Sequence, residues 1–113
     1  MSLFNEQSAF LHDVCRLVEM ATNAGFEVSA RELGRTVEQQ EIYVKTGRSQ
    51  TMKSNHLRNC AIDLYFMRDG QLVMDKDSLQ PLGHFWESLN PMKNSWGGNW
   101  NSFKDLPHFE RRP

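Results

Sequence analysis

The chain has 113 residues, of which 39% are hydrophobic and 11% aromatic, enough for one compact core. Its 13 basic residues nearly balance its 14 acidic residues, so it has no electrostatic footprint for nucleic acid. The first ten residues lack the features of a signal peptide, and no segment approaches the roughly 18 apolar residues that cross a bilayer. We therefore expect a single domain over 1–113, monomeric, made in the cytoplasm and not inserted in a membrane. The two cysteines, Cys15 and Cys60, are predicted to be small core residues rather than a disulfide framework.

Two helices and a strand are predicted in the first part of the chain. Apolar residues recur at helical spacing over 4–24, and Gly25 suits the left-handed position that follows a helix. Residues 26–30 alternate in polarity like a half-buried strand. Thr36 has a glutamine three residues later, a capping-box pattern that predicts the start of a second helix over 37–44.

A polar segment without periodicity, over 47–59, is predicted to be a surface loop. The densest basic run, from Lys45 to Lys53, fits either a solvated loop or contact with an anionic polymer such as cell wall. The clearest strand follows over 60–66, where side chains alternate between two faces. One face carries Cys60, Ile62, Leu64 and Phe66, and the other carries Ala61, Asp63 and Tyr65. The first set is predicted to face the helices, which leaves Asp63 on the open face.

The rest of the chain is predicted to form a hairpin, a helix and a tail. Residues 68–71 indicate a turn, 72–74 a returning strand and 78–90 a helix. The tail from Pro91 is rich in tryptophan, glycine and asparagine. Together these elements predict an α+β fold, with helices packed on one face of a small, mainly antiparallel sheet.

Three side chains from two distant segments have the composition of a catalytic zinc site. Two histidines and one aspartate, His56, Asp63 and His108, fill three corners of a tetrahedron and leave the fourth to water. An extended chain would hold His56 too far from Asp63, so a reversal is predicted at Asn59, which tolerates left-handed angles. The small Ala61, on the same strand face as Asp63, leaves room for an ion.

A second aspartate, Asp105, is predicted to act on the water at that site. It precedes His108 by three residues, and Pro107 between them favours a tight turn with both side chains on one side. Zinc with three protein ligands lowers the pKa of its water to ~7. Asp105 would accept the proton and pass it to the leaving amine. The other two histidines, His12 and His84, are predicted to lie at or near the surface.

The pattern resembles the M15 zinc peptidases, which include D-alanyl-D-alanine carboxypeptidases and dipeptidases. Their Ser-x-His-x6-Asp motif and later acid-x-x-His motif are matched in order by Ser54, His56, Asp63, Asp105 and His108. The resemblance extends over roughly residues 25–110. It implies the fold of D-Ala-D-Ala peptidases and Hedgehog proteins, one zinc ion held by the two histidines and the first aspartate, and Asp105 as general base.

The resemblance also implies a residue that binds substrate. The family has an arginine followed five residues later by a glutamine, which Arg35 and Gln40 match, although the usual preceding tyrosine is absent. Arg35 would stabilise a substrate carboxylate or the oxyanion through a bidentate fork, the alternative being a surface helix cap. Gln40 is interpreted as a site residue or a solvated helix residue, and Ser54 as a substrate contact or a residue that shapes the loop. Asn59 stands where relatives usually have glycine.

A short aromatic and glycine-rich stretch, Trp96-Gly97-Gly98-Asn99-Trp100, most resembles phage endolysins that act as L-alanyl-D-glutamate peptidases. Trp96 and Trp100 are interpreted either as packing residues or as walls of the substrate groove. The two glycines between them admit close approach of backbone.

The sequence therefore predicts a zinc peptidase that cleaves the peptidoglycan stem peptide, with the L-alanyl-D-glutamate bond as the first candidate. An endolysin would be made in the host cytoplasm and act on the cell wall after release. A D-Ala-D-Ala carboxypeptidase of the same family is the nearest alternative. A non-catalytic zinc-binding interaction module is a third, but it would not need the acid at position 105.

Overall fold

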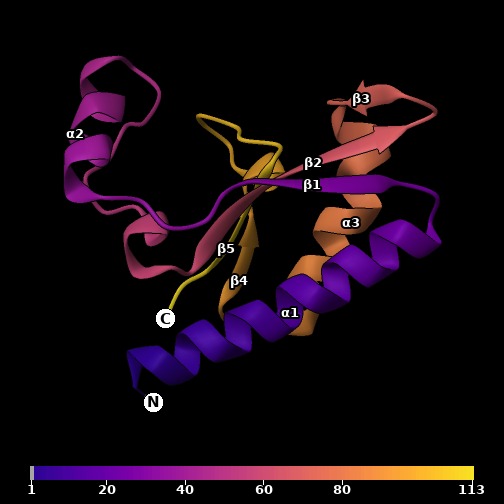
Figure 1. The fold of residues 1–113 in the computed structure, drawn as a ribbon, viewed down its shortest axis with the longest axis horizontal. Coiled ribbons are helices and arrows are strands. Elements are labelled where there is room, and N and C mark those ends of the chain that lie inside the picture. Colours follow the sequence, from indigo (N-terminus) through magenta and orange to yellow (C-terminus); the bar gives the residue numbers. More distant parts are fainter. Residues whose placement is uncertain (1) are drawn as a thin grey trace.

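The computed structural model describes residues 2–113, which form three α-helices, two short 3-10 helices and a five-stranded sheet (Figure 1). In chain order the elements are α1 (Leu3–Asn23), β1 (Glu27–Glu32), α2 (Val37–Lys45), η1 (Asn55–Arg58), β2 (Ala61–Arg68), β3 (Gln71–Val73), α3 (Lys76–Leu89), β4 (Asn94–Trp96), η2 (Gly97–Asn99) and β5 (His108–Arg111). Within this described part, no helix is long and apolar enough to span a membrane.

The sheet is antiparallel throughout and is organised around β2. Its main strand order is β1-β2-β5-β4, and β3 pairs with the far end of β2. Because β2 pairs with three other strands, its register fixes the position of most of the sheet. In that register Asp63 lies opposite His108 of β5.

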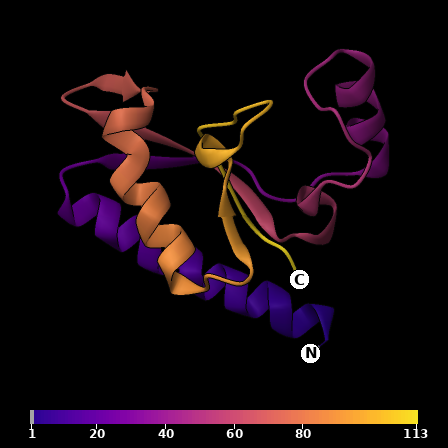
Figure 2. The same ribbon diagram turned by 180° about the vertical axis from the view of Figure 1, so that it is seen from behind.

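Two helices cover one face of this sheet, as the sequence predicted. Helices α1 and α3 pack against each other, and Figure 2 shows them crossing on the side of the molecule away from α2. Their apolar stripes meet the inward face of β2 in one core, whose largest fully buried side chains are Trp86, Trp96, Phe10, Phe66 and Phe109. The predicted inward residues are confirmed, because Ile62, Leu64 and Phe66 of β2 and Cys60 just before it are all buried.

The helix boundaries follow from local capping. Ser2 caps α1 by accepting a hydrogen bond from the backbone N–H of Asn5, and Gly25 beyond its end has a φ of 94°. Thr36 caps α2 by accepting from the backbone N–H of Gln39 at 3.0 Å. The positions of Gly25 and Thr36 confirm the sequence prediction, whereas the cap at Ser2 was not predicted.

Four features differ from the sequence prediction. The tail contains two strands, β4 and β5, that the sequence analysis did not predict. Every residue of β5 is buried, so the strand has no exposed polar face to mark it. The loop before β2 contains a turn of 3-10 helix, η1. Helix α2 lies apart from α1 and α3 rather than with them on the helical face (Figure 1). Cys15 is exposed, so the prediction of a core position holds only for Cys60.

Candidate metal centre and substrate groove

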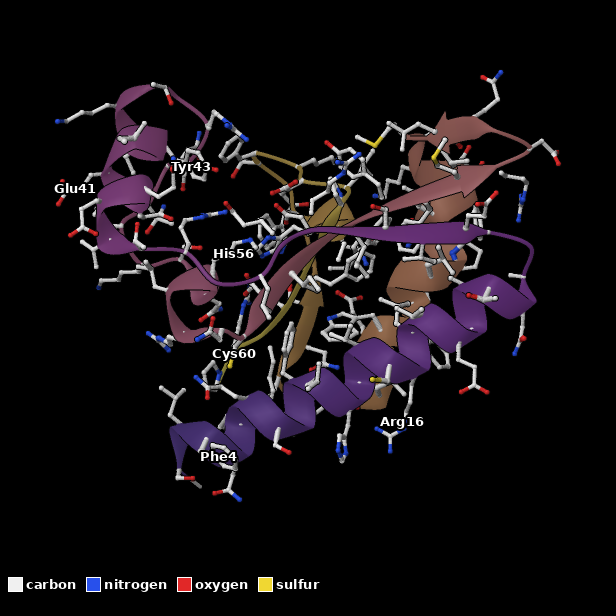
Figure 3. The ribbon with its side chains drawn as sticks, in the orientation of Figure 1. Phe4, Arg16, Glu41, Tyr43, His56 and Cys60 are labelled. Carbon is white, nitrogen blue, oxygen red and sulfur yellow. The ribbon has the colours of Figure 1, made fainter. Side chains whose placement is uncertain are left out.

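The three predicted ligands come together although they arise from three different elements. His56 belongs to η1, Asp63 to β2 and His108 to β5, and one donor atom from each lies within 4.8 Å of the other two. Asp63 Oδ1 is 3.4 Å from His56 Nε2 and 3.4 Å from His108 Nδ1. In Figure 3, His56 lies between α2 and the sheet. The sequence prediction that these residues converge is therefore met by the geometry.

A chain reversal brings His56 back over the strand that carries Asp63. Asn59 adopts left-handed angles, with φ 55° and ψ 36°, and closes η1. The backbone N–H of Cys60 then donates to the carbonyl of Asn55 at 3.0 Å. The reversal lies at the residue where the sequence placed it, and asparagine tolerates the left-handed angles that it requires.

Each histidine ring is oriented by a hydrogen bond on its outer nitrogen. His56 Nδ1 donates to the carbonyl of Leu33 at 2.8 Å, which leaves Nε2 facing Asp63. His108 Nε2 donates to Glu110 Oε1 at 2.7 Å, which leaves Nδ1 facing Asp63. Fixing the outer nitrogen as the donor selects the tautomer whose inner nitrogen can bind a cation.

Glu110 is a site residue that the sequence reasoning missed. It is 6% exposed, and its second carboxylate oxygen accepts from Arg112 Nε at 2.7 Å and from Asn55 Nδ2 at 3.1 Å. A signal was available, because a residue two positions after His108 lies on the same face of a strand. It was not used because the tail was not predicted to be a strand.

The unpaired atoms at the centre of the cluster favour a cation. Within residues 2–113, His56 Nε2 and Asp63 Oδ1 are buried atoms with no hydrogen-bond partner. Buried polar atoms are rarely left unsatisfied, because desolvation costs free energy that no contact returns. Two imidazole nitrogens and one carboxylate oxygen suit a divalent transition metal, and three ligands leave a coordination position open. The residues present therefore fit a metal ion.

The charges of the cluster are strongly coupled in the metal-free protein. Burial alone would raise the pKa of Asp63, but the adjacent imidazoles of His108 and His56, each 3.4 Å away, outweigh it and hold this pKa far below its usual range. Burial alone would lower the pKa of His108, but the neighbouring carboxylates of Asp63 and Glu110 raise that pKa to about 9. Hydrogen bonds from His108 and Arg112 hold the pKa of Glu110 at about 2, against the effect of burial. Two carboxylates thus stabilise positive charge at the position of His108.

Asp105 stands at the entrance to this cluster. Its side chain is 44% exposed, and Oδ2 lies 3.9 Å from His108 Nδ1. Partial burial raises the pKa of its carboxyl above the ordinary value, with the nearby His108 charge opposing and the Asp63 charge assisting the shift. A carboxyl with a raised pKa is a better proton acceptor and donor near neutral pH.

Gly97 allows the backbone of Asp105 to come close enough for this position. The backbone N–H of Asp105 donates to the carbonyl of Gly97 at 3.1 Å. A β-carbon added at Gly97 would lie 2.2 Å from the backbone oxygen of Asp105, so no larger residue fits without moving the acid.

Arg35 is held rigidly beside the cluster. Its guanidinium donates to Glu32 from both Nε and Nη2, and Nη1 donates to Gln40 Oε1 at 2.7 Å. The guanidinium also lies over the ring of Tyr43, which points from α2 towards the sheet in Figure 3. The arginine is thus fixed on its outer side, and it lines both cavities described below together with Asp105.

The two weaker predictions near Arg35 are clarified by burial. Gln40 is fully buried, so the solvated-helix interpretation is wrong, and its amide donates to the carbonyl of Thr51 at 2.6 Å. Gln40 therefore links the Arg35 guanidinium to the 46–54 loop through two hydrogen bonds. Ser54 caps η1 by accepting from the backbone N–H of His56 at 3.2 Å, and it also lines the larger cavity.

Two neighbouring cavities, which share Arg35, Arg48, Phe103 and Asp105 in their linings, make a groove over the cluster. The larger one, about 920 Å³, reaches His56 and His108, and the smaller one, about 670 Å³, reaches Asp63. Trp100 lines the larger cavity, with its ring centre 5.0 Å from that of His108. Trp96 is fully buried, stacks on Phe109 and lines neither of these two cavities. Of the two tryptophans, Trp96 packs in the core and Trp100 forms the groove wall.

Comparisons with known proteins identify the family of this chain. A family model described as D-alanyl-D-alanine carboxypeptidase, of the M15 peptidases, matches residues 47–111. The L-alanyl-D-glutamate peptidase of Listeria phage A118 is 35% identical over 96 residues, which are 84% of this chain and 34% of that protein. The peptidoglycan L-alanyl-D-glutamate endopeptidase CwlK of Bacillus subtilis (strain 168) is 30% identical over 109 residues, covering 82% of this chain and 65% of CwlK.

A solved structure shares the fold. The crystal structure of the Serratia marcescens L-Ala D-Glu endopeptidase ChiX matches with a TM-score of 0.69 and 28% identity, over 88% of this chain and 77% of that one. The chain spans about a third of the phage relative and about two thirds of CwlK. The matched segment contains every residue of the His-Asp-His cluster and Asp105. The chain therefore belongs to the M15 peptidase family.

Proposed function

We propose that this protein is a zinc-dependent peptidase that hydrolyses the L-alanyl-D-glutamate bond of peptidoglycan stem peptides. The observation that carries the proposal is the convergence of two oriented histidines and Asp63 beneath a groove that also contains a carboxyl and a guanidinium. The names of three similar proteins, the phage A118 L-alanyl-D-glutamate peptidase, the endopeptidase CwlK and the L-Ala D-Glu endopeptidase ChiX, support the choice of the L-alanyl-D-glutamate bond. The phage relative supports a role in lysis, in which the enzyme acts on the wall after release from the cytoplasm.

Each site residue has a role that its geometry suits. His56 Nε2, Asp63 Oδ1 and His108 Nδ1 would hold the zinc ion. When bound, zinc polarises the scissile carbonyl and acidifies water at the open position. Asp105 accepts a proton at Oδ2 and returns it to the leaving amine, since its carboxyl faces the cluster and has a raised pKa. Arg35 provides a fixed guanidinium for substrate carboxylate or developing negative charge.

One alternative activity has a specific observation in its favour. The matching family model is described as D-alanyl-D-alanine carboxypeptidase, so cleavage of a terminal D-alanine is the second candidate. A zinc-binding module without activity is disfavoured, because it would not need a carboxyl held over the cluster by a glycine contact.

Digestion of purified peptidoglycan, with zinc present or with a chelator added, tests the proposal. We expect soluble stem peptides with new D-glutamate amino termini, identified by mass spectrometry after amino-terminal labelling, and none of them in the chelated sample. Release of free D-alanine without new D-glutamate termini would instead establish the carboxypeptidase. Equal digestion in both samples would exclude metal dependence.

A further inference from the structure

One wall of the larger cavity concentrates positive charge that no role above requires. The cavity is lined by five of the 13 basic residues of the chain but by only two of its 14 acidic residues. The basic residues are Arg35, Arg48, Lys53, Arg58 and Arg112, and the acidic ones are Asp105 and Glu110. The chain as a whole carries a net charge of −1, so this concentration is local to the groove.

Two of these five charges are already neutralised by neighbouring carboxylates. Arg35 is paired with Glu32, and Arg112 is paired with Glu110. The other three make no ion pair with any carboxylate in residues 2–113. We call Arg48, Lys53 and Arg58 the cationic wall. All three are exposed, and they lie on the segment between α2 and β2 that forms one side of the groove.

The opposite side of the groove has a different chemistry. It is formed by the uncharged residues 99–103, which offer two asparagine amides, a serine hydroxyl and two aromatic rings. Amides and hydroxyls bind peptide backbone, whereas arginine and lysine attract carboxylates. A ligand with peptide backbone along one edge and several negative charges along the other would match both walls.

We propose that the cationic wall selects stem peptides whose carboxylates are free and discriminates against stems in which they are amidated. The inference rests on the proposed function, because a glutamyl residue after the scissile bond brings a free carboxylate into the groove next to the metal centre. Further carboxylates of the stem then follow along the same wall. Arg48 is well placed for this, since its guanidinium lies over the Tyr43 ring at 4.4 Å without losing its charge.

The inference is tested with two synthetic stem peptides that differ only in having free or amidated carboxylates. For the zinc-loaded wild-type protein we expect KM to be about tenfold lower for the free acid at low salt, with kcat nearly equal, because exposed charges each contribute modestly to binding. The advantage should shrink at high ionic strength. The triple variant Arg48→Gln, Lys53→Gln, Arg58→Gln should have the same, higher KM for both peptides and an unchanged kcat.

Matched controls separate this effect from net charge and from folding. The variant Arg16→Gln, Lys45→Gln, Lys76→Gln removes the same charge from outside the groove, and it should keep the wild-type preference. Melting temperatures of both triple variants should match that of the wild type. A triple variant that retained the preference, or a wild type that cleaved both peptides equally, would overturn the inference and leave the proposed function standing.

The remaining outcomes are also decisive. If neither peptide is cut at the L-alanyl-D-glutamate bond, the proposed function fails, and calorimetric binding of the uncut peptides then tests the wall directly. The proposed selectivity would still be supported if the wild type bound the free-acid peptide more tightly than the amidated one and the triple variant of the cationic wall did not. Equal binding of the two peptides by the wild type would contradict it. If polyglycerol phosphate competes as strongly as the free-acid peptide, the wall recognises polyanions in general and the assignment to stem carboxylates is wrong.

Discussion

The floor of the groove and its walls are built in different ways. The floor carries buried side chains: His56, at 1% exposure, lies on η1 directly before β2, and His108, at 5%, lies on β5, which pairs with β2. The walls, residues 46–54 and 99–103, have no regular strand and expose most of their side chains. Rigid, buried groups suit chemistry that needs fixed geometry, whereas exposed loops suit recognition. Substitutions in the floor should therefore affect metal binding and turnover, and those in the walls should affect KM.

The largest effect is expected at a metal ligand. His108→Ala should abolish both stoichiometric zinc binding and peptidase activity, because it leaves two ligands and frees Asp63 and Glu110 from their shared partner. Zinc content by elemental analysis and turnover of wall fragments measure this. His84→Ala, which removes an exposed histidine from α3, is the control and should change neither. Full zinc occupancy in the His108 variant would contradict the ligand assignment.

A large but purely kinetic effect is expected at the entrance to the cluster. Asp105→Asn should lower kcat by about 10²–10⁴-fold while zinc affinity stays near wild type, since the amide keeps the shape of the side chain but cannot accept a proton. Steady-state kinetics and zinc titration of the same sample measure kcat and zinc affinity separately. A variant that lost zinc together with activity would make Asp105 a ligand rather than a base.

A smaller effect on zinc binding is expected at Glu110, which bonds to the outer nitrogen of His108. Glu110→Gln should weaken zinc binding by about 10–100-fold, because the neutral amide no longer stabilises the His108 ring as a charged acceptor does. Competition with a chromogenic chelator measures the affinity. Glu41→Gln removes an acid that points away from the groove on α2 and serves as the matched control (Figure 3). Unchanged affinity in the Glu110 variant would mean that its bond to His108 is only structural.

The smallest effect is expected in the stability of the metal-free protein as pH changes. The pKa of His108 is raised from 6.5 to about 9, so its protonated form is favoured by folding. This contribution to stability is fully present below pH 6.5 and is lost as the pH rises towards 9. The melting temperature of the metal-free form should therefore fall across this range. Added zinc should stabilise more at the upper end, where His108 is deprotonated. A metal-free melting temperature that rose from pH 6.5 to 9 would contradict the proposed pairing.

The sequence was most informative where local rules apply. Capping at Thr36, the left-handed turn at Asn59 and the alternation of β2 each depend on a few neighbouring residues, and all three were predicted correctly. The convergence of His56, Asp63 and His108 was predicted from ligand chemistry rather than from folding rules.

The errors arose where tertiary contacts decide the outcome. In strand β5 the polar side chains are buried along with Phe109, so polarity does not distinguish an inner face from an outer one, and the role of Glu110 was missed together with the strand. Gln40 is buried by the loop that folds over α2, which no periodicity in the helix indicates. Cys15 lies among apolar residues in sequence but on the outer side of α1.

Because Asp63 and His108 lie opposite each other on two paired strands, an ion bound between them would also stabilise the sheet. Strand β4 is joined to the sheet only through β5, so the β2–β5 seam holds the whole C-terminal edge in place. An ion bound by both Asp63 and His108 would crosslink β2 to β5 and so close the loop of chain between them. Such a crosslink would lower the entropy of the unfolded chain and stabilise the paired strands. Extracting the ion should let the last two strands open more often, and the amide protons of β4 and β5 should then exchange with solvent sooner than those of β1.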